Sequence, residues 1–372
     1  MSVFIYLGFR AAEYVSLSYL ISFLLVLPFG LFYVYRIYKG LKPSKEEEGF
    51  DQVGFGKEVL AFGVVMMSTL LLNVIVQNID KVMIGSFLGE DGLDDITVYS
   101  FAAAISNLIA IVPVAIATIF LPLASEKISG KKEELKEITD LSTKWIIMGS
   151  LPIMIVFAVF SKEILGMIYG SLYESGAFML TVLAIGIFVR CIAIPAGNTL
   201  AALRKIEIEF IVTLVAALVN VGLNFWLIPA YGANGAAFAS AVALVLSAGL
   251  VVYYYSKVTS MRLEFEWKGL LLAGLLATLV TVGLRPIIEP LLRFTAFTVY
   301  DNSEFYILFL NKVVKAGILG IVCALAFGVY TAGLVLSRTF GRHEIEILEG
   351  IMERLKLPKK LINAVSNILS RN

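Results

Sequence analysis

The longest uncharged stretch of the chain runs from Phe210 to Ser256 and reads FIVTLVAALVNVGLNFWLIPAYGANGAAFASAVALVLSAGLVVYYYS. About 20 apolar residues in a helix cover the hydrocarbon core of a bilayer, so this stretch is long enough for two membrane-spanning helices. Pro229 ends a helix, and Gly232 and Gly235 permit a sharp reversal of the chain. Small side chains then let the two helices approach closely: Gly235, Ala236, Ala237 and Ala239. We expect this hairpin to be structural.

The rest of the chain has the same character. Of its 372 residues, 59% are hydrophobic and only 16% are charged, whereas about a quarter of a soluble domain is charged. Only helices and closed barrels satisfy every backbone group in lipid, and the short alternating segments of a barrel are absent. The sequence therefore predicts an all-α polytopic membrane protein with about nine spans. They lie near Tyr14–Tyr38, Leu60–Leu88, Val98–Ala124, Trp145–Phe160, Ser175–Leu203, Ile206–Pro229, Gly235–Ser256, Gly269–Leu284 and Phe305–Ser337.

The loops between these spans alternate between basic and non-basic. The loop after the first span is rich in Lys and Arg, whereas the next, Gly89–Thr97, is acidic and has no basic residue. Because cytoplasmic loops carry the excess of Lys and Arg, the pattern predicts a cytoplasmic C-terminus in the cell membrane and an external Met1. The segment Met1–Glu13 is too short to span and resembles the end of an earlier helix. Apolar residues recur at helical spacing over Glu344–Leu369, which predicts an amphipathic helix on the inner membrane surface or against cytoplasmic loops.

Several functions are disfavoured by composition. The two cysteines lie in apolar runs, and the single histidine is in the charged tail, so we expect neither a disulfide nor a metal site. A formal net charge of +1 argues against a nucleic-acid partner. No GxxxxGK[ST] motif for ATP is present, and we expect no cofactor. The acidic loop Gly89–Thr97 is short and reads as solvated, which disfavours a membrane glycosyltransferase or polymerase.

Arg190 is the sharpest candidate for a binding residue. It lies near the middle of a predicted span, where an ionisable group costs roughly 2.5–3.5 kcal/mol on insertion scales. An arginine that faces a cavity could hold the diphosphate of a lipid-linked sugar, because its planar fork binds phosphate oxygens in pairs. The alternative is a structural pair with a carboxylate or with carbonyl groups at a helix end.

A second group of candidates lies in the outer part of the second span. Asp80 could bind a coupling cation or pair with a basic residue such as Arg190 across a cavity. Lys81 could contact phosphate or reach the outer headgroups. Asn73, Gln77 and Asp80 share one helix face, which we expect to line a water-accessible cavity where amides bind sugar hydroxyls.

Other polar or helix-breaking residues have simpler readings. We expect the remaining asparagines of the spans to join helices by hydrogen bonds: Asn107, Asn198, Asn220 and Asn224. Pro113 and Pro195 fall inside spans and predict kinks there.

Three stretches carry a resemblance to a known family: FGVVMMSTLLLNVIVQNIDKVMIGSFLGE (62–90), IFLPLASEKISG (119–130) and NVGLNFWLIPAYGANGAAFASA (220–241). Together they resemble the prokaryotic polysaccharide transporters, which are O-antigen and lipid-linked oligosaccharide flippases of the multidrug/oligosaccharidyl-lipid/polysaccharide exporter superfamily. The tail, HEIEILEGIMERLKLPKKLINAVSNIL (343–369), is similar to the tails of archaeal members. The most specific signature is the IPxYGxxGAA hairpin.

The resemblance implies two six-helix lobes around a central cavity that opens alternately to each side. In this chain, residues 1–57 align with the end of the first lobe and a cytoplasmic linker. Residues 58–257 align with the complete second lobe, 258–340 with two extra C-terminal helices, and 341–372 with the cytoplasmic tail. The first lobe is otherwise not represented. We therefore expect an N-terminally incomplete sequence, or a half that works with a partner lobe or as a homodimer.

The function implied is transport of a polyprenyl-diphosphate sugar across the cytoplasmic membrane for surface polysaccharide or glycoprotein synthesis, with no enzymatic step. Two alternatives remain at this point. One is a cation-coupled exporter of drugs or other small molecules in the same superfamily, which is disfavoured because Asp80 is the only clear carboxylate expected inside the membrane. The other is an inactive half-transporter.

Overall fold

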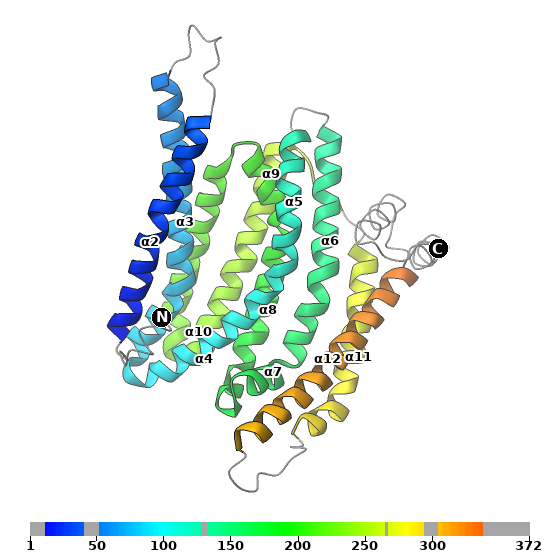
Figure 1. Ribbon diagram of the computed structural model, residues 1–372. Helices are drawn as coiled ribbons and strands as arrows, with labels where there is room; N and C mark the ends of the chain where they lie inside the picture. Colours follow the sequence, from blue (N-terminus) through cyan, green and yellow to red (C-terminus); the bar gives the residue numbers. More distant parts are fainter. Residues whose placement is uncertain (1–11, 41–51, 128–131, 265–266, 294–303, 338–372) are drawn as a thin grey trace. The chain divides into compact units, whose positions relative to one another are not determined.

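The computed structural model describes residues 12–40, 52–127, 132–264, 267–293 and 304–337. The chain divides into two units, Met1–Ala61 and Phe62–Asn372. Every regular element in the described ranges is a helix (Figure 1), so the chain is the all-helical polytopic membrane protein that the sequence predicts. The amphipathic tail expected over Glu344–Leu369 lies outside the described residues, and the boundaries between the four predicted domains stay predictions.

The helices coincide with the expected spans. In order along the chain they are α2 (Ala12–Gly40), α3 (Gln52–Leu88), α4 (Gly92–Ser106), α5 (Ile111–Lys127), α6 (Lys132–Val159), α7 (Ser161–Ile168), α8 (Ala177–Ile192), α9 (Ile194–Ala202), α10 (Ile206–Thr259), α11 (Trp267–Arg293) and α12 (Glu304–Leu336). Seven helical stretches of the described residues are long and apolar enough to cross a membrane, and they overlap all the expected spans except the first. The first falls in α2, whose described apolar part is the shorter stretch Leu24–Tyr33.

Among the span boundaries that differ from the prediction, two lie at acidic helix starts. The acidic segment Gly89–Thr97 is not a loop: a 3-10 turn, η1 (Gly89–Asp91), leads directly into α4, with Asp94 and Asp95 in its first turn. Carboxylates are stabilised there because the helix dipole is positive at its N-terminus. For the same reason α6 begins at Lys132, well before the expected Trp145, with Glu133 and Glu134 in its first turn.

Both expected proline kinks coincide with breaks in the helices. A 3-10 segment, η2 (Asn107–Ala110), separates α4 from α5, and Pro113 follows it. Likewise Ala193 separates α8 from α9, and Pro195 occupies the first turn of α9. Proline is tolerated in a first turn, where the missing N–H would have no helical partner. The chain thus bends within two of its spans.

The hairpin predicted within Phe210–Ser256 is formed by α10. Gly232 has a φ of +58° and a ψ of −143°, a conformation nearly confined to glycine, and it separates the arms 206–231 and 233–259. A side chain at Gly235 would lie 2.2 Å from the carbonyl oxygen of Leu227, so the second arm turns back directly against the first. The reversal is confirmed, but the helix does not end at Pro229: it continues to the glycine, where the backbone can change direction.

Helices α4, α5, α6, α8, α9 and α10 pack into one bundle, and α11 pairs with α12 beside α6 (Figure 1). The main core lies among α4, α7, α8 and α10 and includes the fully buried Ile84, Ala102, Phe160, Leu165 and Leu180. Helix α3 contributes Met83 and Ile84 to this core, whereas its apolar side chains from Val64 to Ile75 are largely exposed. Residues 64–75 of α3 therefore present an exposed apolar surface, and the helix joins the core only from about Asp80 onward.

Candidate functional site: a polar cavity inside the spans

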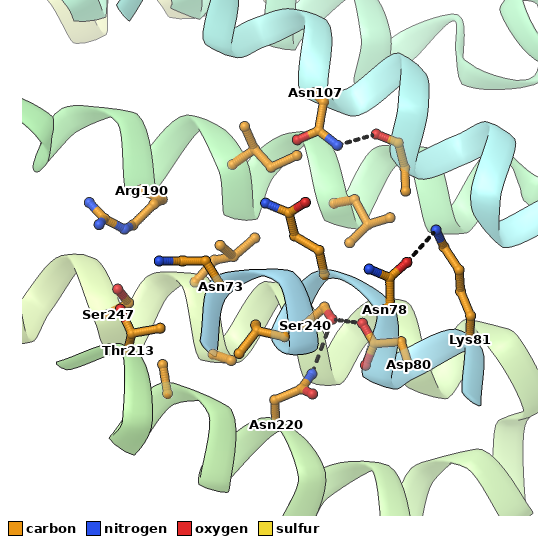
Figure 2. A pocket seen from close by; sticks show the side chains of 18 of the residues that line it. Asn73, Asn78, Asp80, Lys81, Asn107, Arg190, Thr213, Asn220, Ser240 and Ser247 are labelled. Atoms are coloured by element: carbon orange, nitrogen blue, oxygen red, sulfur yellow. Dashed lines mark hydrogen bonds between the residues drawn. The ribbon is translucent and has the colours of Figure 1, made fainter. Parts of the chain in front are cut away.

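A cavity of about 530 Å³ lies among α3, α4, α8 and the two arms of α10. Its walls combine apolar side chains with polar ones (Figure 2). The polar members are Asn73, Gln77, Asn78, Asp80, Lys81, Tyr99, Ser100, Asn107, Arg190, Thr213, Asn220, Ser240 and Ser247. All five residues that the sequence predicts for a binding site border this one cavity. Whether they bind a substrate stays a prediction.

Asp80 lies at one side of the cavity within a network of hydrogen bonds. Its side chain is 3% exposed and accepts hydrogen bonds from the Tyr99 hydroxyl at 2.5 Å, from the Ser240 hydroxyl, and from the Asn224 amide at 2.7 Å. Asn220 in turn donates to Ser240 Oγ at 3.0 Å. Three donors compensate a carboxylate for the loss of water, so this buried charge is a well-supported part of the bundle.

The same network identifies what the sequence reading missed. Tyr99 and Ser240 lie on α4 and on the second arm of α10, and neither was predicted as a site residue. The expectation that asparagines join helices is confirmed for two of them, because Asn224 and Asn220 connect α10 to α3 and to its own second arm. Asn224 Oδ1 is buried without a hydrogen-bond partner among the described residues, so one acceptor of the network is unused.

Arg190 lies on the opposite side of the cavity from Asp80 (Figure 2). Its guanidinium Nη2 is 2.7 Å from Glu209 Oε1, and the two side chains are 23% and 34% exposed. The pairing of Asp80 with Arg190 that was considered from the sequence is therefore wrong in this structure. Arg190 does pair with a carboxylate, as one of its two readings allowed, and whether it also binds a substrate stays a prediction. Glu209 was not predicted because it lies near the start of its span, where a charge is unremarkable.

A second cavity, of about 260 Å³, adjoins the first at Arg190 and Ile194. Its polar lining includes Thr69, Asn198, Lys205 and Glu209. Glu209 borders only this second cavity, whereas Arg190 borders both. The Arg190–Glu209 ion pair thus stands where the two cavities meet, at the break between α8 and α9.

The remaining predicted residues are arranged as their helix positions require. Asn73 donates to the backbone oxygen of Thr69 at 2.9 Å, one turn earlier in α3. Lys81 Nζ lies 3.4 Å from Asn78 Oδ1, and its side chain diverges from that of the buried Asp80, because adjacent helix positions are about 100° apart (Figure 2). Gln77 is exposed toward the cavity. The wall therefore presents amide side chains and two cations, whereas its carboxylate, Asp80, is buried.

Comparison with known proteins supports the resemblance drawn from the sequence. Residues 50–178 match a family model described as polysaccharide biosynthesis protein. The probable low-salt glycan biosynthesis flippase of Haloferax volcanii is 25% identical over 56% of this chain and 46% of its own length. A Shigella flexneri protein with the provisional name O-antigen transporter is 24% identical over 55% of this chain and 48% of its own. The chain thus spans about half the length of these relatives.

Among solved structures, lipid II flippase MurJ in an inward closed conformation matches with a TM-score of 0.51. The match covers 78% of this chain and 58% of that chain at 19% identity, and it shows a common fold. Residues 50–178 therefore carry the sequence pattern of the polysaccharide biosynthesis proteins, on a fold that the chain has in common with MurJ.

Proposed function

We propose that this chain forms part of a transporter that moves a lipid-linked oligosaccharide, a polyprenyl-diphosphate sugar, across the cytoplasmic membrane. The observation that carries the proposal is the cavity of about 530 Å³ within the spans, bordered by two cations and by several amide side chains. The relatives named as a flippase and a transporter support it and favour transport over an enzymatic reaction.

The lining suits the two polar parts of such a substrate. Arg190 and Lys81 are cationic, and guanidinium and ammonium groups are the usual protein partners of diphosphate oxygens. Gln77 and Asn73 present amides that can exchange hydrogen bonds with sugar hydroxyls. Energy would come from an ion gradient, the membrane potential or the gradient of the substrate itself.

The cavity is bordered by one set of helices, and in our proposal a facing lobe completes it. A second six-helix lobe, or a second copy of this chain, would provide the opposite wall and allow the cavity to open alternately to the two sides. The basic loops assign the C-terminus, the end of α9 and the start of α10 to the cytoplasmic side. Arg190 then belongs to the inner half of the membrane and Asp80 to the outer half.

Flipping of a fluorescent polyprenyl-diphosphate sugar in proteoliposomes tests the proposal. The protein should increase the fraction of substrate accessible on the opposite leaflet, and Arg190→Ala should lower the rate by about tenfold, as expected when one charge-assisted contact of roughly 1.5 kcal/mol is lost. Arg262→Ala is the matched control, since Arg262 is exposed in the segment after α10 and borders neither cavity. Equal flipping by Arg190→Ala and wild type would remove the phosphate-binding role.

A second candidate, cation-coupled export of a small molecule, is favoured by the network around Asp80. Carboxylate, amide and hydroxyl oxygens converge there from α3, α4 and both arms of α10, and Asn224 Oδ1 has no hydrogen-bond partner in the described part of the chain. Buried carboxylates of membrane helices often mark ion or proton paths. Export of a fluorescent dye driven by an imposed proton or sodium gradient, lost in Asp80→Asn, would support this candidate, and unchanged drug sensitivity after deletion of the gene would count against it.

A further inference from the structure

We propose that the Glu209 carboxylate competes with a ligand for Arg190. When a ligand enters, Arg190 exchanges this carboxylate for the ligand's diphosphate. Glu209 is thus a positioning residue: it holds the arginine at the junction of the two cavities until an anion takes its place. The inference rests on the proposed function, because it concerns how the same cavity binds a diphosphate group.

The position of the ion pair carries the argument. Arg190 borders both cavities, whereas Glu209 borders only the second one. The guanidinium is therefore reachable from the first cavity while its partner carboxylate stays in the second. A ligand that enters the first cavity therefore meets an arginine whose charge is balanced by a carboxylate in the second cavity.

The geometry of the pair favours exchange over permanent pairing. One contact joins the two side chains, from Arg190 Nη2 to Glu209 Oε1, and not the double contact of a paired fork. Both side chains also keep part of their surface accessible, at 23% and 34%. A partly hydrated pair with a single contact is weak enough for a diphosphate, with more oxygens and more charge, to replace the carboxylate.

The surroundings can also receive the released carboxylate. Glu209 Oε2 lies close to the first turn of α9, where a side chain at Gly197 would be 3.8 Å from it, and Lys205 borders the same cavity. Partial positive charge at a helix N-terminus and a nearby ammonium both stabilise a carboxylate. Both groups can therefore stabilise the Glu209 carboxylate after Arg190 turns to the ligand.

Calorimetric titration of wild-type protein in nanodiscs with farnesyl diphosphate and, separately, inorganic pyrophosphate tests the competition. Removing the competing charge in Glu209→Gln should tighten diphosphate binding by about fivefold, whereas Arg190→Ala should weaken it by about tenfold, and Glu209→Gln should have no effect in that background. Glu207→Gln is the matched control: it removes the same charge two residues earlier in the same helix, from an exposed side chain that borders neither cavity. Binding of farnesyl diphosphate but not of pyrophosphate would identify the ligand as a lipid-linked diphosphate. Binding of both would show that the site accepts diphosphate in general.

A second measurement uses the wild-type protein, so it does not depend on how well a variant folds. Carbodiimide labelling of carboxyl groups, read by mass spectrometry, should increase at Glu209 when pyrophosphate or farnesyl diphosphate is added and should stay constant at Glu207. Binding that is unchanged or weaker in Glu209→Gln, or constant labelling of Glu209, would overturn the exchange while leaving the proposed function intact. Failure of the wild type to bind either diphosphate would instead contradict the proposed function, and the exchange with it.

Discussion

At the scale of single residues, Asp80 is the clearest example of a charge made tolerable by its neighbours. An isolated carboxylate inside a membrane helix is costly, yet three donors from α4 and α10 surround this one. The burial of Asp80 depends on these hydrogen bonds, because a buried acceptor without donors would carry the full free-energy cost of desolvation. The network therefore holds α3 to the bundle at the edge of the cavity.

Asp80→Asn should destabilise the protein by about 1–3 kcal/mol, since an amide replaces one acceptor oxygen with a donor that faces other donors. Thermal unfolding in detergent measures the change. The variant Asp94→Asn serves as the control, because Asp94 is exposed in the first turn of α4 and should contribute no more than about 0.3–1 kcal/mol through the helix dipole. Equal effects of the two substitutions would show that the network does not stabilise the fold.

At the scale of elements, the α10 hairpin depends on one backbone conformation. The chain reverses at Gly232, where φ is +58° and ψ is −143°, and the arms then approach so closely that Asn220 reaches Ser240. This contact joins residues that a straight helix would hold about 30 Å apart. The hairpin thus places the two asparagines of the first arm and the serine of the second around Asp80.

Gly232→Ala should lower the free energy of unfolding by about 1–3 kcal/mol, because a Cβ is strained in this backbone region. The matched control is Gly222→Ala in the first arm of the same helix, where a Cβ meets nothing within 4 Å. Alanine there should be neutral or stabilising by up to about 1 kcal/mol, given its higher helix propensity. Chemical unfolding of both variants in micelles gives the comparison, and a Gly232→Ala protein as stable as the control would contradict the strained turn.

At the scale of the whole molecule, a small polar cluster connects the segment after α10 to the N-terminal part of α6. Lys136 lies 2.8 Å from Asp140 and 2.8 Å from Glu264, and the backbone N–H of Glu264 donates to Asp140 at 3.1 Å. These contacts connect the α11–α12 pair to the bundle at the side that the basic loops assign to the cytoplasm. Lys136 lowers the pKa of the Glu264 carboxyl by hydrogen bonding and by its charge.

The lowered pKa has a defined consequence for stability. The contribution of Glu264 is present above its ordinary pKa of about 4.3 and is lost as the pH falls through the lower folded-state value. The difference in thermal midpoint between wild type and Glu264→Gln should therefore be constant near neutral pH and disappear in acid. It should also shrink at about 1 M salt, since the carboxylate is exposed. A difference that grows in acid would contradict the assignment.

The orientation of the molecule in the membrane is a separate prediction. A cysteine at Asp94 should react with a membrane-impermeant maleimide in intact cells, whereas one at Glu133 should react only after the membrane is opened. Both positions are exposed at helix starts. The background from the native thiols should be low, because Cys191 is buried and Cys323 is half-buried in its helix. The reverse labelling pattern would invert the proposed topology.

The sequence by itself determined the membrane-spanning helices, the reversal at Gly232 and the face that carries Asn73, Gln77 and Asp80. These features follow from apolar length, backbone freedom and helical period, which are local properties of the chain. Only the tertiary structure decided the partners of the charges. Asp80 accepts a hydrogen bond from Ser240, which is 160 residues away in the sequence, and Arg190 pairs with Glu209 and not with Asp80. Such pairings depend on how helices pack side by side, and no local pattern specifies which faces will meet.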